Sequence, residues 1–116
     1  MNTENILSLR HTFDSCKCEY ISIKDWDTSN VDDFSYMFYW AQKLINIDLS
    51  EMNTSKAVNY SYMFDAAGVI ESRRGTADLS NFNFSKNPEI KSMIQYSRFY
   101  HIRLNNWDFN GIEEKT

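Results

Sequence analysis

The segment WDTSNVDDFSYMF (residues 26–38) returns in altered form as MNTSKAVNYSYMF (residues 52–64), at an offset of 26 residues. The match extends backward, from Ile21–Ile23 to Ile47–Leu49, and forward, from Leu44 to Ile70. Self-similarity at a fixed period of this length is the mark of a repeat architecture. One such unit cannot bury its own apolar face, but stacked units cover one another.

Further copies extend the repeat along the chain. A third unit follows at an offset of 30, with its extra residues in a predicted loop, and a fourth, partial unit places Leu104 at an offset of 25 from Leu79. A half unit at the N-terminus matches Phe13 to Phe38. The predicted organisation is a single domain, 1–116, composed of a half unit 1–19, a unit 20–45, a unit 46–75 with an inserted loop 71–76, a unit 76–100 and a partial unit 101–116.

Within each unit the apolar spacing changes. Ile47–Leu49 alternates apolar and polar residues, which is typical of a short half-buried strand. Val31, Phe34 and Phe38 recur at steps of three and four, which favours one face of a short helix, and Ser29 and Asn87 resemble residues that begin helices. The fold class predicted is an α/β repeat, a small solenoid with a short parallel sheet on one side and short helices on the other.

The stacking makes two positional predictions. Equivalent apolar residues of the strands should lie side by side as rungs, namely Ile23, Leu49, Leu79 and Leu104. A polar column should mark the corner after each strand, where Asn and Asp side chains commonly bond backbone groups, namely Asp27, Asn53, Asn83 and Asp108.

The repeat resembles that of the DUF285 family of bacterial surface proteins, which is related to BspA-type leucine-rich repeats. Leu44–Ser50, Trp26–Val31, Tyr36–Phe38 and Phe13 with Cys16 carry the resemblance. It implies a leucine-rich-repeat-like solenoid and a binding role, often in adhesion, with no catalytic residues. Typical members are long and secreted, whereas this chain is short and is expected to lack a leader, so the resemblance also raises the alternative of a small phage-encoded effector.

Composition and charge narrow the function classes. The chain of 116 residues contains eight Phe, seven Tyr and three Trp, which is unlike a disordered chain. Its net charge is −4, so general binding to a nucleic-acid backbone is not expected. Residues 1–65 hold ten acids and five bases, which makes the N-terminal half the acidic one. No secretory signal or membrane-length apolar run is present, and the expectation is a cytoplasmic protein with no membrane contact.

Catalytic and metal-binding patterns are weak. Cys16 and Cys18 are expected to be reduced, small apolar residues, because near neighbours rarely pair and free cysteines are usually buried. The alternative is a metal site that uses His11, Cys16 and Cys18 with His101 as a distant fourth ligand. No phosphate loop or nucleophile motif is present, so neither an enzyme nor a cofactor is predicted.

The partner-binding candidates are aromatic and basic residues. Tyr36, Tyr39, Trp40, Tyr60 and Tyr62 are expected to divide between core and contact surface. A cluster from Tyr96 to His101, beside Arg98 and Arg103, is either a plug at the end of the stack or a docking surface. The inserted loop is either functional or merely solvated. The predicted partner-binding residues are Tyr36, Tyr39, Trp40, Tyr62, Arg73, Arg74, Tyr96, Arg98, Tyr100, Arg103 and Trp107.

Besides a metal-dependent enzyme at His11, Cys16 and Cys18, two functions remain open from the sequence. The first is a non-catalytic module that binds a protein, either alone or within a nucleoprotein complex. The alternative is a small inhibitor, encoded by a phage or mobile element, of a bacterial defence nuclease complex of the CRISPR type. In that case the acidic N-terminal half would stand in for nucleic-acid phosphates. A homodimer through the exposed ends of the stack is a further prediction.

Overall fold

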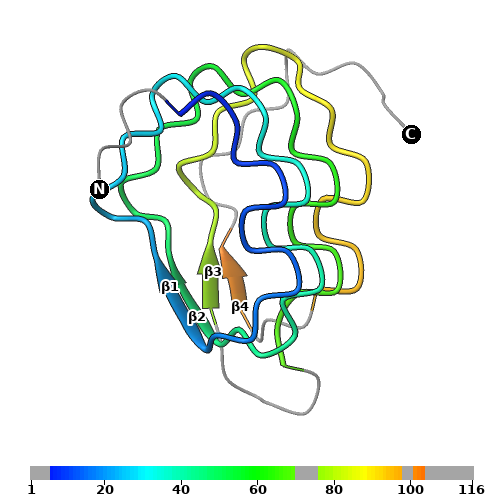
Figure 1. Ribbon diagram of the computed structural model, residues 1–116. Helices are drawn as coiled ribbons and strands as arrows, with labels where there is room; N and C mark the ends of the chain where they lie inside the picture. Colours follow the sequence, from blue (N-terminus) through cyan, green and yellow to red (C-terminus); the bar gives the residue numbers. More distant parts are fainter. Residues whose placement is uncertain (1–5, 70–75, 98–100, 104–116) are drawn as a thin grey trace.

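The chain winds into successive coils that lie side by side in a computed structural model, which describes residues 6–69, 76–97 and 101–103 (Figure 1). Each coil contributes one short strand to a single parallel sheet with the order β1-β2-β3-β4. The strands are β1 (Tyr20–Ser22), β2 (Asn46–Asp48), β3 (Thr76–Asp78) and β4 (His101–Arg103). None of the described residues belongs to a helix that could cross a membrane.

The strand register follows the repeat spacing. Ile21 pairs with Ile47, and Asn46 pairs with Thr76. One step beyond the paired strands, this register brings Ile23, Leu49 and Leu79 into the same rung, and all three are buried. The predicted rung is therefore present for these residues, while Leu104 lies outside the described residues. The strands begin one residue earlier than the alternating pattern indicated.

The prediction of an α/β repeat with short helices is wrong, because the described residues contain no helix. Where a short helix was expected to carry Val31, Phe34 and Phe38, the chain makes consecutive turns at residues 35–40. Met37 N–H donates to the carbonyl of Phe34, and Ala41 N–H donates to that of Phe38, each three residues back. The expected helix start at Asn87 is likewise wrong, since Asn87 has a φ of 51° and its N–H donates to Phe84.

Every second backbone N–H group in these turns donates its hydrogen bond to a neighbouring coil. Phe34, Tyr36, Phe38 and Trp40 donate to carbonyls of the next coil, at 2.9, 3.0, 2.8 and 3.0 Å. The acceptors are Asn59, Ser61, Met63 and Asp65. The coils on either side repeat the pattern, through donors at Leu9, His11, Phe13 and Ser15 and at Tyr60, Tyr62, Phe64 and Ala66. Together these hydrogen bonds between coils form a stepped ladder, which we call the turn ladder. It lies opposite the strands, on the right of Figure 1.

The ladder requires an unusual backbone at every fourth residue. Tyr36 and Trp40 have φ angles of 58° and 57°, and the equivalent Tyr62 and Ala66 both have 58°. The angle φ is also positive at the equivalent residues of the flanking coils, namely His11, Ser15, Ser92 and Tyr96. The left-handed conformation costs an L-residue about 1–2 kcal/mol. Hydrogen bonds between coils, at about 0.5–1.5 kcal/mol each, and the apolar interior offset this cost.

The interior is built from aromatic rings stacked across coils. Phe38 lies between Phe13 and Phe64, with ring centroids 5.6 and 5.1 Å away. Tyr60 is also in the core, against Phe34, and its buried hydroxyl donates to the carbonyl of Asn83 at 2.8 Å. Burial raises the pKa of Tyr60 to about 12. Since Tyr60 is fully buried, it belongs to the core part of the predicted aromatic group.

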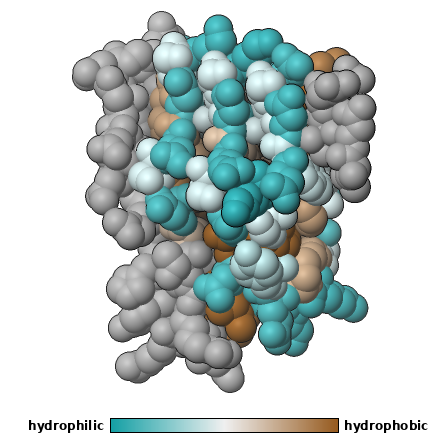
Figure 2. Space-filling view, turned by 90° about the vertical axis from the view of Figure 1, so that its left-hand side faces the viewer, coloured by the Kyte–Doolittle hydropathy of each residue, from teal (hydrophilic) through white to brown (hydrophobic). Residues whose placement is uncertain are grey.

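The predicted polar corner is confirmed for three of its four members. Asp27, Asn53 and Asn83 each accept the backbone N–H two residues ahead, at 3.0, 2.9 and 2.9 Å. Asp108 lies outside the described residues. The buried hydroxyl of Thr28 donates to the carbonyl of Asn53 at 2.9 Å, and so fastens adjacent coils at the corner. Hydrophilic side chains gather in columns over the upper part of the strand side (Figure 2).

Two neighbouring alanines test the turn ladder. Ala66 has a positive φ and Ala67 does not, although both are buried. We expect Ala66→Gly to raise the free energy of unfolding by about 0.5 kcal/mol. The relief of the left-handed conformation, about 1–2 kcal/mol, exceeds the extra chain entropy of glycine, about 0.5–1 kcal/mol. Ala67→Gly should lower it by about 0.5–1 kcal/mol. Urea unfolding measures both, and equal losses, as in a helix, would contradict the ladder.

Candidate functional site

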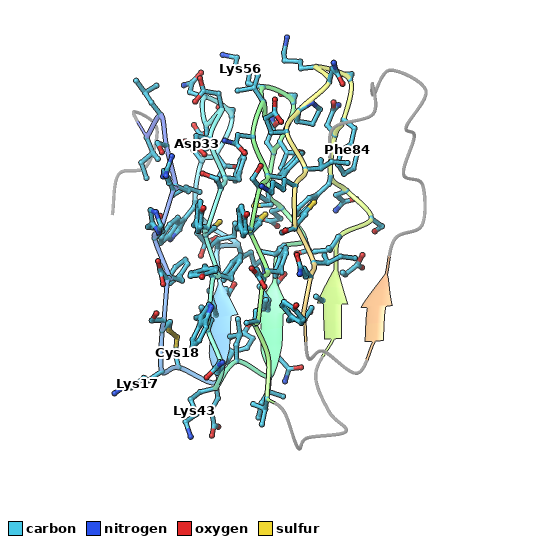
Figure 3. The ribbon with its side chains drawn as sticks, turned by 90° about the vertical axis from the view of Figure 1, so that its right-hand side faces the viewer. Lys17, Cys18, Asp33, Lys43, Lys56 and Phe84 are labelled. Atoms are coloured by element: carbon cyan, nitrogen blue, oxygen red, sulfur yellow. A yellow bond between two sulfur atoms is a disulfide. The ribbon has the colours of Figure 1, made fainter. Side chains whose placement is uncertain are left out.

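A column of stacked rings runs across three coils on the stepped side of the molecule. His11 and Tyr36 have ring centroids 4.6 Å apart, and Tyr36 and Tyr62 are 4.9 Å apart. These residues occupy equivalent ladder positions, since each donates its backbone N–H to the neighbouring coil. Figure 3 shows this side of the molecule, with rings following one another from coil to coil.

Two further rings and one cation extend this column. Tyr39 meets Tyr36 and Tyr62 edge-on, at 5.2 and 6.3 Å, and Trp40 follows Tyr39 at 6.1 Å. The Arg10 guanidinium lies 5.3 Å from the centre of the Tyr36 ring, a distance suited to a cation–π contact. We call this set the aromatic face: Arg10, His11, Tyr36, Tyr39, Trp40 and Tyr62.

The aromatic face is partly exposed and rigidly held. Tyr36, Tyr39 and Tyr62 are half-buried, whereas Trp40 is 50% exposed. The backbones of Tyr36, Trp40 and Tyr62 are fixed by hydrogen bonds to the next coil. Each stacked ring also restricts the rotamer of its neighbour. A partner would therefore meet side chains that have little conformational entropy left to lose.

The structure brings four of the predicted partner-binding residues together, namely Tyr36, Tyr39, Trp40 and Tyr62. Tyr96 is 66% exposed and continues the column of Trp40, with the small Ala66 between them. The backbone of Arg103 lies in β4, and its side chain is outside the described part of the structure. The remaining candidates fall outside the described residues: Arg73, Arg74, Arg98, Tyr100 and Trp107.

Sequence reasoning did not place Arg10 and His11 at this face. The signal was present, because the offset of 25 that matches Phe13 to Phe38 also matches His11 to Tyr36. The sequence suggested His11 only as a ligand of the alternative metal site, whereas His11 stacks on Tyr36 and its Nδ1 lies 2.7 Å from a carboxylate oxygen of Asp14.

The cysteines differ from their predicted state. Cys16 and Cys18 form a disulfide, so the prediction of reduced thiols is wrong, and these sulfurs are not free to act as thiolate metal ligands. No group of His, Cys, Asp and Glu suited to a metal ion occurs among the residues that the structure describes. Cys16 opens into a pocket of about 230 Å³ that is lined by Ser15, Cys16, Lys17, Trp40, Gln42 and Lys43.

Asp65 is a buried carboxylate beside the aromatic face. It occupies the ladder position equivalent to Asp14 and Tyr39, and the residue as a whole is only 8% exposed. Its Oδ1 atom is buried and has no hydrogen-bond partner within the described part of the chain. Loss of solvation raises the pKa of Asp65 above its ordinary value of 3.8. Ionised Asp65 therefore costs the folded state free energy at neutral pH.

We expect Asp65→Asn to increase the free energy of unfolding at pH 7. The folded-state pKa is raised, so the wild-type protein loses stability as pH rises above the unfolded value near 3.8. The advantage of the variant should shrink as the pH falls below that value. Asp14→Asn is the control, because Asp14 has its His11 partner and should give no gain. Denaturant unfolding at several pH values measures this, and an Asp65→Asn variant that is less stable at pH 7 would contradict it.

Comparison of the sequence with models of protein families identifies the family of the chain. A family model described as "Mycoplasma protein of unknown function, DUF285" matches residues 7–116. No curated protein and no solved structure matches the chain. The matched region contains all four strands and the whole aromatic face. The chain therefore belongs to the DUF285 family.

Proposed function

We propose that this protein is a non-catalytic module that binds another protein through its aromatic face. The observation that carries the proposal is the stack of His11, Tyr36 and Tyr62 with the half-exposed Trp40 at its margin. Tyr, Trp and Arg are the residues most enriched at energetic hot spots of protein interfaces. The aromatic face places all three types on neighbouring coils.

The arrangement of the rings supports a protein partner over a planar ligand stacked within the column. The faces of the Tyr36 ring are covered by His11 and Tyr62, so the edges and hydroxyls are left to meet a partner. Tyr side chains offer a large apolar area together with one hydrogen-bonding group. A surface of this kind suits a mixed apolar and polar protein epitope.

The alternative of a nucleic-acid mimic has less support from the geometry. Hydrogen bonds from Ser29 and Ser50 hold the pKa values of Asp27 and Asp48 below the ordinary value, which keeps both carboxylates charged. However, Asn53 and Asn83 follow Asp27 in its column, so the charge of that column is interrupted at the next coil. In the strand register, Asp48 is followed by Asp78 and then by the basic Arg103. Inhibition of a defence nuclease, a relation to BspA-type adhesion repeats, a cytoplasmic location and pairing of chain ends stay as predictions.

The test is capture of partners on the immobilised chain from a lysate of the encoding organism. We expect Tyr39→Ser with Trp40→Ser to weaken binding of a captured protein about thirtyfold, as loss of a hot spot does. Tyr20→Ser is the matched control, because Tyr20 is 60% exposed on the strand side and should leave the affinity unchanged.

The salt dependence of partner binding distinguishes the protein-binding module from the nucleic-acid mimic. Binding through the aromatic face should change little between about 0.1 M and about 0.5 M salt, whereas binding through mimicked phosphates should weaken steeply. A partner retained equally by the wild type and the double variant, or released by salt and by Tyr20→Ser, would contradict the proposal.

A further inference from the structure

The Cys16–Cys18 disulfide adds little to the stability of the coil that contains it. The stabilisation from a cross-link grows with the length of the loop that it closes, and these residues are separated by only two positions. Hydrogen bonds to the next coil already fasten the chain on both sides. Ser15 N–H donates to Tyr39 at 2.7 Å, and Glu19 accepts from Ile45 at 2.8 Å.

The surroundings of Cys16 suit a reactive sulfur. Cys16 lines the pocket, together with Lys17 and Lys43, and the backbone N–H of Cys18 lies 3.2 Å from Cys16 Sγ. Figure 3 shows Lys17, Cys18 and Lys43 at the same end of the coils. Ammonium groups and an N–H donor favour a thiolate over a thiol. Cys18 is not among the residues that line this pocket, so the two sulfurs differ in access.

We infer that Cys16 and Cys18 form a thiol–disulfide exchange site for thiols that carry negative charge, with Cys16 as the sulfur that bonds to the substrate. This activity goes beyond the proposed binding function and does not depend on it. The two lysines supply the charge preference. The pocket beside Cys16 has a volume of about 230 Å³, which gives a substrate thiol room to approach the sulfur.

The exchange is balanced without a further oxidant. A substrate thiolate attacks Cys16 Sγ, the Cys16–Cys18 bond breaks, and its electron pair goes to Cys18 Sγ, which takes up a proton. A second substrate thiolate then attacks the substrate sulfur of this mixed disulfide and releases Cys16 as a thiolate. Two substrate thiols are thereby oxidised to a disulfide, and the protein disulfide is reduced to a dithiol.

The full-length protein tests the structural part of this inference. Reduced glutathione should add two hydrogens to the intact mass, and oxidised glutathione should remove them again. The circular dichroism spectrum should stay unchanged, because hydrogen bonds rather than the disulfide hold the coil. Failure to form the intramolecular disulfide, or unfolding upon its reduction, would overturn the inference.

Single-cysteine variants test the roles of the two sulfurs. Reduced Cys18→Ser should form a mixed disulfide with oxidised glutathione severalfold faster than reduced Cys16→Ser, because Cys16 opens into the pocket beside Lys17 and Lys43 and Cys18 does not. Mass spectrometry follows the reaction. Equal rates in the two variants, or faster reaction at Cys18, would overturn the assignment of Cys16.

The lysines are tested in the Cys18→Ser variant. Lys17→Gln with Lys43→Gln should slow the reaction with oxidised glutathione, and should slow it less with the uncharged 2-hydroxyethyl disulfide. Lys24→Gln with Lys86→Gln changes the net charge equally at exposed positions elsewhere and should leave both rates unchanged. Equal slowing by the two pairs of substitutions would contradict a charged site at this pocket.

Discussion

Every second backbone N–H on the stepped side of this protein needs a carbonyl from the neighbouring coil. A buried N–H without a partner is costly, so a single coil of this shape cannot exist alone. The neighbouring coil supplies acceptors at 2.8–3.0 Å for the donors from Phe34 to Trp40. This requirement fixes the parallel stacking, because the acceptors meet the donors only when equivalent residues lie side by side.

The same constraint creates the candidate binding surface. Parallel extended segments lie about 4.8 Å apart, so rings at equivalent positions of adjacent coils come into stacking distance. The Tyr36–Tyr62 separation of 4.9 Å and the Phe38–Phe64 separation of 5.1 Å are examples, one on the surface and one in the core. The backbone ladder thus determines both the packing of the interior and the rigidity of the aromatic face.

The repeat spacing was sufficient to predict the strand pairing, since an offset of 26 places Ile21 beside Ile47. It did not distinguish helix from turn. Phe34 and Phe38 recur at a step of four in either structure, and the difference lies in whether their N–H groups bond within the segment or across coils. The repeat spacing also predicted part of the aromatic face, because it makes Tyr36 and Tyr62 equivalent positions of adjacent units. The disulfide was not predicted, because cysteines only two positions apart in the chain rarely pair with each other.

The most direct test of the stacked ladder is a scalar coupling across a hydrogen bond, measured by NMR in solution. The structure predicts a coupling between the amide nitrogen of Phe38 and the carbonyl carbon of Met63, which lies in the next coil. A coupling from Phe38 to the carbonyl of Phe34, as in a helix, would contradict the ladder and the arrangement of the surface built on it.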